Sequence, residues 1–131
     1  MKRRLPLFIL AVAALVLGIF RTPAVDLQNA FAQGKPADAK VTFVEIGSVN
    51  CIPCRAMQPI MKEVEEEFKG QIKVVFYDVW TPKGKADAAK YNIRVIPTQV
   101  FLDKDGKEYF RHEGYFPKEG VVQAVRMQGV R

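Results

Sequence analysis

Apolar and polar residues follow a regular pattern from residue 41 onward, and it predicts a strand followed by a long helix. The segment VTFVEI, residues 41–46, is apolar almost throughout, which is typical of a strand buried on both faces of a parallel sheet; only the charge of Glu45 interrupts it. Over residues 51–69 apolar positions recur at helical spacing, and a glycine follows as an end signal. Pro59 lies inside this helix and predicts a kink.

The rest of the chain continues to alternate strands and helices. IKVVFYDV has the pattern of another buried strand, and the turn Lys104-Asp105-Gly106 predicts an antiparallel hairpin between two later strands. Strand, helix, strand and helix in succession indicate a βαβ unit and therefore an α/β fold. The expected elements are strands at 72–79, 99–103 and 107–114, and helices at 85–91 and 117–127, with a loop through Thr81, Pro82 and Gly84.

The amino terminus has a different pattern, which is typical of an export signal. MKRR forms a positive cap, and the following 16 residues, Leu5 to Phe20, are apolar and uncharged. A membrane-spanning helix needs roughly 20 such residues, so a cleaved signal and a membrane anchor both stay open, while a buried core helix is disfavoured by the preceding cations. Residues 1–34 are assigned to the signal or anchor plus a linker, and residues 35–131 to a folded domain outside the cytoplasm.

Length and charge limit the classes of function. With 131 residues, 49% of them hydrophobic, the chain suffices for one domain of ordinary size and not for two. Half of the net charge of +6 comes from residues 1–32, and beyond them basic and acidic side chains are interspersed. We therefore expect no nucleic-acid partner, and we expect a monomer.

The reactive chemistry of the chain is concentrated in CIPC, residues 51–54, which holds its only two cysteines. A structural disulfide is disfavoured, because closing so short a loop contributes only roughly 2 kcal/mol. A metal site needs about four ligands, whereas the chain adds a single histidine, His112, in a distant expected strand. Covalent haem attachment requires histidine directly after the second cysteine, where Arg55 stands. The pattern favours a redox centre that uses no metal and no cofactor.

The position of the pair favours a thiolate at Cys51. The cysteines lie where a strand gives way to a helix, so the unpaired amides and the positive dipole end of the helix stabilise that thiolate by about 0.3–1 kcal/mol. Arg55 adds a nearby positive charge. Pro53 falls in the first turn, where it loses no hydrogen bond and stiffens the loop between the sulfurs.

Three features of the chain together resemble the thioredoxin family. They are CIPC at a strand-to-helix junction, Pro59 five residues after Cys54, and IRVIPT some forty residues later, in the order in which the family carries them. The resemblance covers Val41 to about Met127, and GSVNCIPCRAMQPIM with YDVW is most similar to small exported members. It implies the thioredoxin fold, with a central mixed sheet of four or five strands flanked by helices.

The resemblance also implies roles for single residues. Cys51 is the attacking thiol, Cys54 the buried resolving thiol, and Pro97 the cis-proline beside them. Glu45 stands where the family has a buried acid, and its apolar flanks favour burial over the alternative of a solvated strand residue. A buried carboxyl with a raised pKa can accept the proton of Cys54. The residues expected to support the site are Ile52, Pro53, Arg55, Ile96 and Thr98.

By this resemblance the chain is expected to be an enzyme, a protein-disulfide reductase outside the cytoplasm. Its partners would be disulfide-containing proteins and a membrane electron donor. A disulfide oxidase or isomerase stays open as an alternative, as does a non-catalytic protein that passes on a metal or an assembly partner. Trp80 and Phe76 are assigned to core or loop packing and His112 to a strand surface, so that none of the three is given a function.

Overall fold

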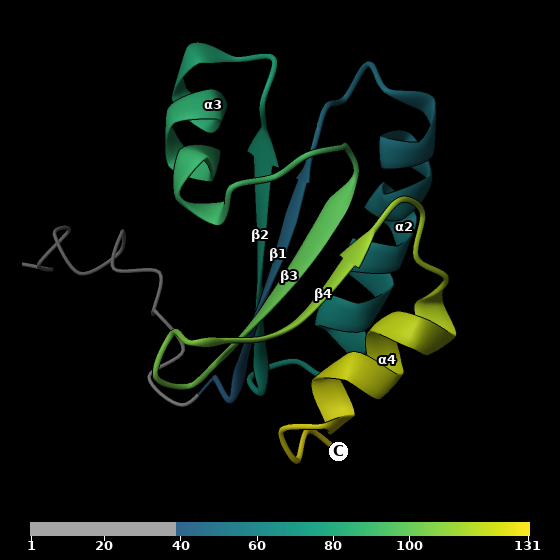
Figure 1. The fold of residues 1–131 in the computed structure, drawn as a ribbon. Coiled ribbons are helices and arrows are strands. Elements are labelled where there is room, and N and C mark those ends of the chain that lie inside the picture. The colour runs from purple at the N-terminus through teal and green to yellow at the C-terminus, as the bar shows by residue number, and fades with distance from the viewer. Residues whose placement is uncertain (1–38) are drawn as a thin grey trace, which may run out of the picture. The chain divides into compact units, whose positions relative to one another are not determined.

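The computed structural model describes residues 39–131, which form one sheet with helices on both of its faces (Figure 1). The expected export signal and its linker, residues 1–34, lie outside the described residues, as do residues 35–38 of the expected domain. In chain order the elements are β1 (Val41–Gly47), α2 (Ile52–Glu67), β2 (Ile72–Asp78), α3 (Pro82–Ala88), the 3-10 turn η2 (Ala89–Tyr91), β3 (Thr98–Asp103), β4 (Glu108–Glu113) and α4 (Lys118–Arg126).

The sheet is mixed and has four strands in the order β2-β1-β3-β4. β1 pairs in parallel with β2 and antiparallel with β3, which pairs antiparallel with β4. The βαβ unit and the carboxyl-terminal hairpin predicted from the sequence are therefore confirmed, as is the mixed sheet flanked by helices. The hairpin turns at Gly106, whose φ of +79° favours glycine.

One prediction about burial was wrong. β1 lies between two strands and is buried on both faces as expected, whereas β2 is an edge strand in which only Ile72 is buried. The apolar run in β2 resembles that of a central strand, but among the described residues no further strand pairs with its outer edge. Burial on both faces depends on strand order, which the local pattern of β2 does not contain.

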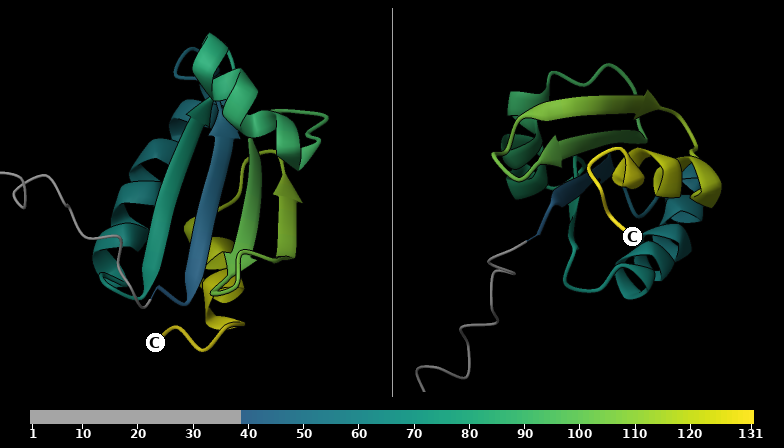
Figure 2. Two further views of the ribbon diagram at one scale, coloured as in Figure 1. Left: turned by 90° about the vertical axis from the view of Figure 1, so that its left-hand side faces the viewer. Right: turned by 90° about the horizontal axis from the view of Figure 1, so that it is seen from below.

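The two faces of the sheet carry separate apolar clusters. α2 and α4 cover one face, where Phe43 of β1 stacks on Phe101 of β3 with ring centroids 4.8 Å apart. α3 and the following 3-10 turn cover the other face, against Val44 and Val100 (Figure 2). Alternate residues of β1 therefore point to opposite layers, as the two-residue period of a strand requires.

α3 begins earlier than predicted. The side chain of Thr81 accepts a hydrogen bond from the Gly84 amide at 3.0 Å, and Pro82 follows in the first helical turn, so the expected loop is already helix. Gly84 is required by a close approach, because a Cβ there would lie 2.0 Å from the backbone oxygen of Asp78. None of the helices within residues 39–131 is both long and apolar enough to cross a membrane.

Candidate active site

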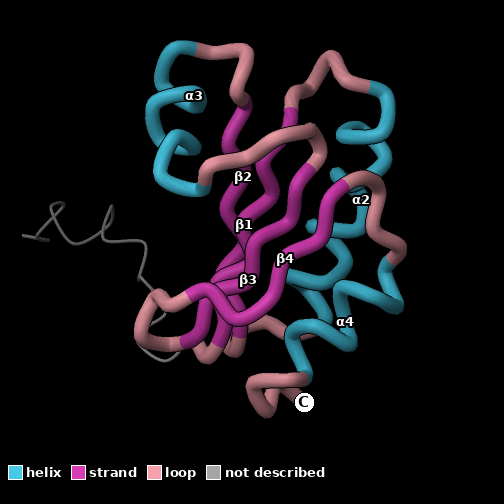
Figure 3. The backbone as a smooth tube through the Cα atoms, in the orientation of Figure 1, coloured by secondary structure: helices cyan, strands magenta, loops and turns pink. Residues whose placement is uncertain are grey.

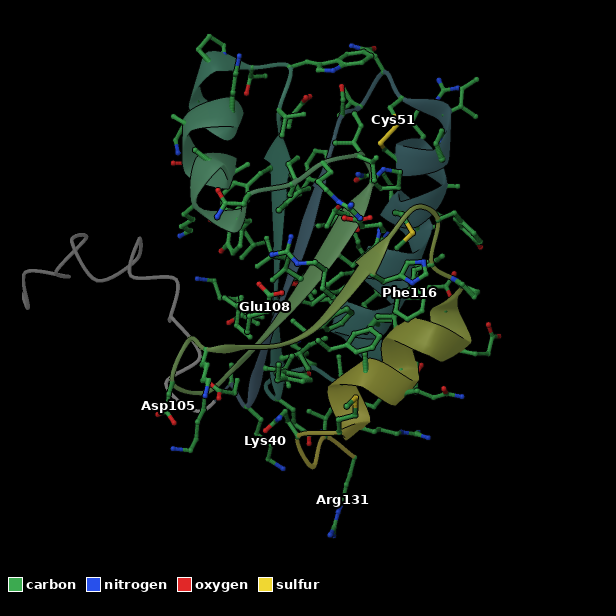
Figure 4. The ribbon with its side chains drawn as sticks, viewed as in Figure 1. Lys40, Cys51, Asp105, Glu108, Phe116 and Arg131 are labelled. Atoms are coloured by element: carbon green, nitrogen blue, oxygen red, sulfur yellow. A yellow bond between two sulfur atoms is a disulfide. The ribbon has the colours of Figure 1, made fainter. Side chains whose placement is uncertain are left out.

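Cys51 and Cys54 form a disulfide at the start of α2 (Figure 4). Their Cα atoms are 5.2 Å apart. Cys51 is partly exposed, whereas Cys54 is fully buried against the sheet. An incoming sulfur can therefore reach Cys51 and not Cys54.

The local sequence explains why the sulfur of Cys51 lies at the helix end. Cys51 is the N-cap residue of α2, with an extended backbone, and its carbonyl accepts a hydrogen bond from the Arg55 amide at 2.9 Å. Pro53 lies in the first turn, which contains no acidic residue and whose amides receive no side-chain cap. The positive end of the helix is thus not neutralised, and it favours negative charge on the sulfur.

Glu45 lies under the disulfide in β1 and is fully buried. Burial raises the pKa of this carboxyl from 4.5 to about 8, and Gln99 beside it opposes the rise. Even so, neither carboxylate oxygen has a hydrogen-bond partner of good geometry among the described residues. The alternative of a solvated strand residue does not hold.

Gly47 brings this carboxyl close to the inner sulfur. A Cβ at Gly47 would lie 3.1 Å from Sγ of Cys54 and 3.7 Å from Oε1 of Glu45. Both groups therefore approach the same stretch of β1 backbone, which a larger side chain would occupy. Gly47 was not predicted as a site residue, although a glycine at the end of a buried strand is a signal for close approach.

The loop before β3 reaches the same end of the sheet (Figure 3). Thr98 pairs with Ile46, so Pro97 comes next to Gly47 in the register. The peptide bond between Ile96 and Pro97 is cis, and Pro97 is buried while Ile96 is partly exposed. The carbonyl of Pro97 accepts a hydrogen bond from the Gly114 amide at 2.8 Å, which ties this loop to the end of β4.

Exposed apolar side chains gather at the end of the sheet that carries the disulfide. Of the six large apolar side chains exposed within residues 39–131, five lie at this end of the sheet, and only Met127 lies elsewhere. Trp80 is 61% exposed, so the expectation that it packs in the core was wrong. The five, which we call the apolar rim, are Val49, Ile52, Trp80, Val95 and Tyr115.

His112 is not part of this site's sulfur chemistry. Its ring stacks on Phe116 at 4.1 Å between centroids, and its Nε2 lies 3.2 Å from the carbonyl oxygen of Tyr115. Phe116 lies beside α4 in Figure 4, away from the labelled Cys51. Within residues 39–131 no three histidine, cysteine, aspartate or glutamate side chains are grouped so as to hold a metal ion.

Comparison with solved structures supports the same fold. Thioredoxin f from spinach chloroplast superposes with a TM-score of 0.60 at 24% identity, covering 72% of this chain and 81% of that one. A mutant thioredoxin from Halobacterium salinarum gives a TM-score of 0.61 at 22% identity, covering 70% of this chain and 77% of that one. The architecture is therefore the thioredoxin fold.

Comparison of sequences identifies the family. The thioredoxin-like domain family matches residues 24–128. Thioredoxin Y2 of Arabidopsis thaliana chloroplasts is 40% identical over 86 residues, 66% of this chain and 50% of that protein. The thioredoxin-like protein HCF164 of the same organism is 28% identical over 102 residues, 78% of this chain and 37% of that protein. The chain thus spans half or less of these plant relatives.

A bacterial relative is matched over most of its length. The thioredoxin of Mycoplasmopsis pulmonis is 37% identical over 91 residues, which cover 66% of this chain and 82% of that protein. The region that the family matches contains the disulfide, the cis-proline loop and all four strands of the sheet. The chain belongs to the thioredoxin-like family.

Proposed function

We propose that this protein is a thiol-disulfide oxidoreductase that reduces disulfide bonds in other proteins. The observation that carries the proposal is the asymmetry of the cysteine pair: Cys51 is reachable at a helix amino terminus, while Cys54 is buried above the Glu45 carboxyl. Such a pair can attack with one sulfur and resolve with the other. The relatives named as thioredoxins support the same activity.

The reaction begins from the reduced dithiol. The Cys51 thiolate attacks one sulfur of a substrate disulfide, which forms a mixed disulfide and releases the other substrate sulfur as a thiolate. Cys54 then loses its proton and attacks the Cys51 sulfur, which releases the second substrate thiolate. Two electrons have passed to the substrate, and the Cys51–Cys54 disulfide of this structure is the product.

Glu45 is the proposed acceptor of the Cys54 proton. Its carboxyl lies on the same stretch of β1 backbone as the Cys54 sulfur, and its pKa of about 8 leaves part of it ionised at neutral pH. A base with a pKa near the working pH takes a proton and returns it with little cost. The pKa shift that burial produces therefore suits the resolving step.

Protein substrates suit the surface around Cys51. The apolar rim offers side chains that an unfolded or extended segment can cover beside its disulfide. Four loops and the first turn of α2 supply the rim, so a substrate chain would contact several of these segments at once.

After each turnover a separate reductase must reduce the Cys51–Cys54 disulfide to the dithiol again. A similar solved structure, 25% identical with a TM-score of 0.59, is described as a complex of ferredoxin:thioredoxin reductase and thioredoxin f2. For this protein we propose a donor in a membrane, because the positive cap and apolar run of residues 1–20 predict export. A reporter that is active only in the cytoplasm, fused after Arg131, should then be silent, and an active reporter would contradict export.

The division of labour between the sulfurs tests the proposed function. Cys51→Ser should abolish turnover of a protein disulfide in the presence of a dithiol donor. Cys54→Ser should instead accumulate mixed disulfides, because attack proceeds without resolution. The double serine variant is the control and should trap nothing. Equal loss of activity without trapped adducts in either single variant would contradict the assignment.

A further inference from the structure

A row of side chains crosses the sheet directly beneath the disulfide. In the strand register Glu45 of β1 lies opposite Phe76 of β2 and Gln99 of β3, and Gln99 lies opposite His112 of β4. Directly opposed residues share a face of the sheet, and this face is the one that α2 covers. The row therefore leads from the carboxyl below Cys54 to the partly exposed His112 at the far edge strand.

Gln99 is the member of the row that the local sequence pattern did not predict as a site residue. It is fully buried, and both its Oε1 and its Nε2 lack a hydrogen-bond partner of good geometry among the described residues. The two oxygens of Glu45 are in the same condition. Buried polar atoms without partners cost about 1–3 kcal/mol each, so an apolar side chain at position 99 would serve the core better.

We propose that Gln99 is a positioning residue of the redox site, whose amide holds the Glu45 carboxyl toward Cys54 in both of its protonation states. This inference rests on the proposed function, in which Glu45 takes the Cys54 proton. An amide both donates and accepts: Nε2 donates to the carboxylate, and Oε1 accepts from the carboxylic acid. When the Cys54 thiol passes its proton to Glu45, rotation of the amide keeps the pair bonded while the thiolate attacks Cys51.

Among the described residues, Gln99 is the only side chain whose hydrogen bonding affects the pKa of Glu45. β2 places Phe76 opposite Glu45 in the register, and the Cys54 sulfur of α2 approaches the same stretch of β1 backbone as the carboxyl. The one further titratable group of the row, His112, lies beyond Gln99. Burial raises the pKa of Glu45 and Gln99 lowers it, and no charged side chain adds to these two effects.

Replacing the amide with a side chain of similar shape tests the proposal. Gln99→Met keeps the volume and removes both hydrogen-bonding groups. Direct titration of isotope-labelled glutamate carboxyls by NMR, in the oxidised protein, should show the pKa of Glu45 rising by about one unit. The pH at which disulfide turnover reaches half its maximum should rise equally, so that turnover near pH 7 falls roughly tenfold. Alkylation of Cys51 should be unchanged.

Gln58→Met is the matched control, since the Nε2 of Gln58 is also buried without a hydrogen-bond partner within residues 39–131, and Gln58 has no effect on the pKa of Glu45. It should leave both the titration and the pH profile as in the parent. If methionine at position 99 disturbs folding, Gln99→Leu is the second variant. The same rise in the pKa of Glu45 is expected for it.

The outcomes separate this inference from the proposed function. An unshifted Glu45 pKa in both Gln99 variants overturns the role of Gln99, even if the parent is fully active. An equal shift in Gln58→Met also overturns it. A parent that turns over no protein disulfide overturns the proposed function, while the titration of Glu45 still decides whether Gln99 pairs with it.

Discussion

Glu45 is a carboxyl group in the interior of the protein, where carboxyl groups are seldom found. It is fully buried, and its pKa is raised from 4.5 to about 8 because burial penalises the charged form. Between these two pH values the folded protein holds a proton that the unfolded chain has released. The contribution of Glu45 to the free energy of unfolding is therefore highest below about pH 4.5. It falls as the pH rises and stops falling above about pH 8.

Glu45→Gln should remove this dependence, because a glutamine in the same place carries no proton that folding retains. Denaturant unfolding of the oxidised parent should show a loss of up to about 3 kcal/mol between about pH 5 and about pH 8, and the variant should show a much smaller loss. Glu108 and Glu113 are ion-paired with arginines that lower their pKa, so their titration falls below this window. If the free energy of unfolding changed with pH in the same way in both proteins, burial would not be what sets the pKa of Glu45.

At the scale of elements, one residue at the end of β2 holds two loops of the site together. The carboxylate of Asp78 accepts hydrogen bonds from the amide of Val49 at 3.5 Å and from the amide of Trp80 at 3.0 Å. The Val79 amide also donates to the carbonyl of Gly47 at 2.9 Å. The loop before α2 and the loop before α3 are thereby joined, and both contribute to the apolar rim.

Trp80→Ala should weaken recognition of protein substrates. The indole is exposed at the end of the sheet that carries the disulfide, and losing an aromatic contact with a substrate typically costs about 1 kcal/mol or more, so kcat/KM for a protein disulfide should fall roughly fivefold or more. Reduction of a small organic disulfide should be nearly unchanged. Met127→Ala is the control, since Met127 is equally exposed at the end of α4. An equal effect of Trp80→Ala on the protein disulfide and on the small organic disulfide would show that the indole does not contribute to recognition of protein substrates.

At the scale of the whole molecule, the direction of electron flow depends on how strongly the fold favours the dithiol over the disulfide. Strong oxidants owe that character to a heavily stabilised reduced form. Here the uncapped first turn of α2 and Arg55 supply some stabilisation, but Ile52-Pro53 between the cysteines brings no second cation. A proline in that second place resembles the reducing members of the family.

We therefore expect a reduction potential nearer to thioredoxin than to the periplasmic oxidases. Equilibration with glutathione buffers of graded ratio, followed by alkylation of free thiols, measures it. The protein should become oxidised at ratios that leave a strong oxidase reduced. A protein that stays reduced under oxidising ratios would reverse the direction and make this chain a disulfide donor.

Local patterns in the sequence determined most of the elements and the place of the chemistry. The apolar run specifies β1, the helical spacing of apolar residues specifies α2, and the turn at Lys104-Asp105-Gly106 specifies the hairpin, because each signal depends only on near neighbours. The two cysteines, separated by two residues at a strand-to-helix junction, locate the redox pair in the same way. Glu45 also stood out, as a charge inside an apolar strand.

Only the tertiary structure decided how distant segments meet. Strand order made β2 an edge strand, and the loop that follows it left Trp80 exposed beside the cysteines. Strand register set Gln99 against Glu45, and the close packing of α2 on β1 required glycine at position 47. These relations join residues that lie far apart in the chain, so no window of local sequence contains them; they follow from the packing of whole strands and helices against one another.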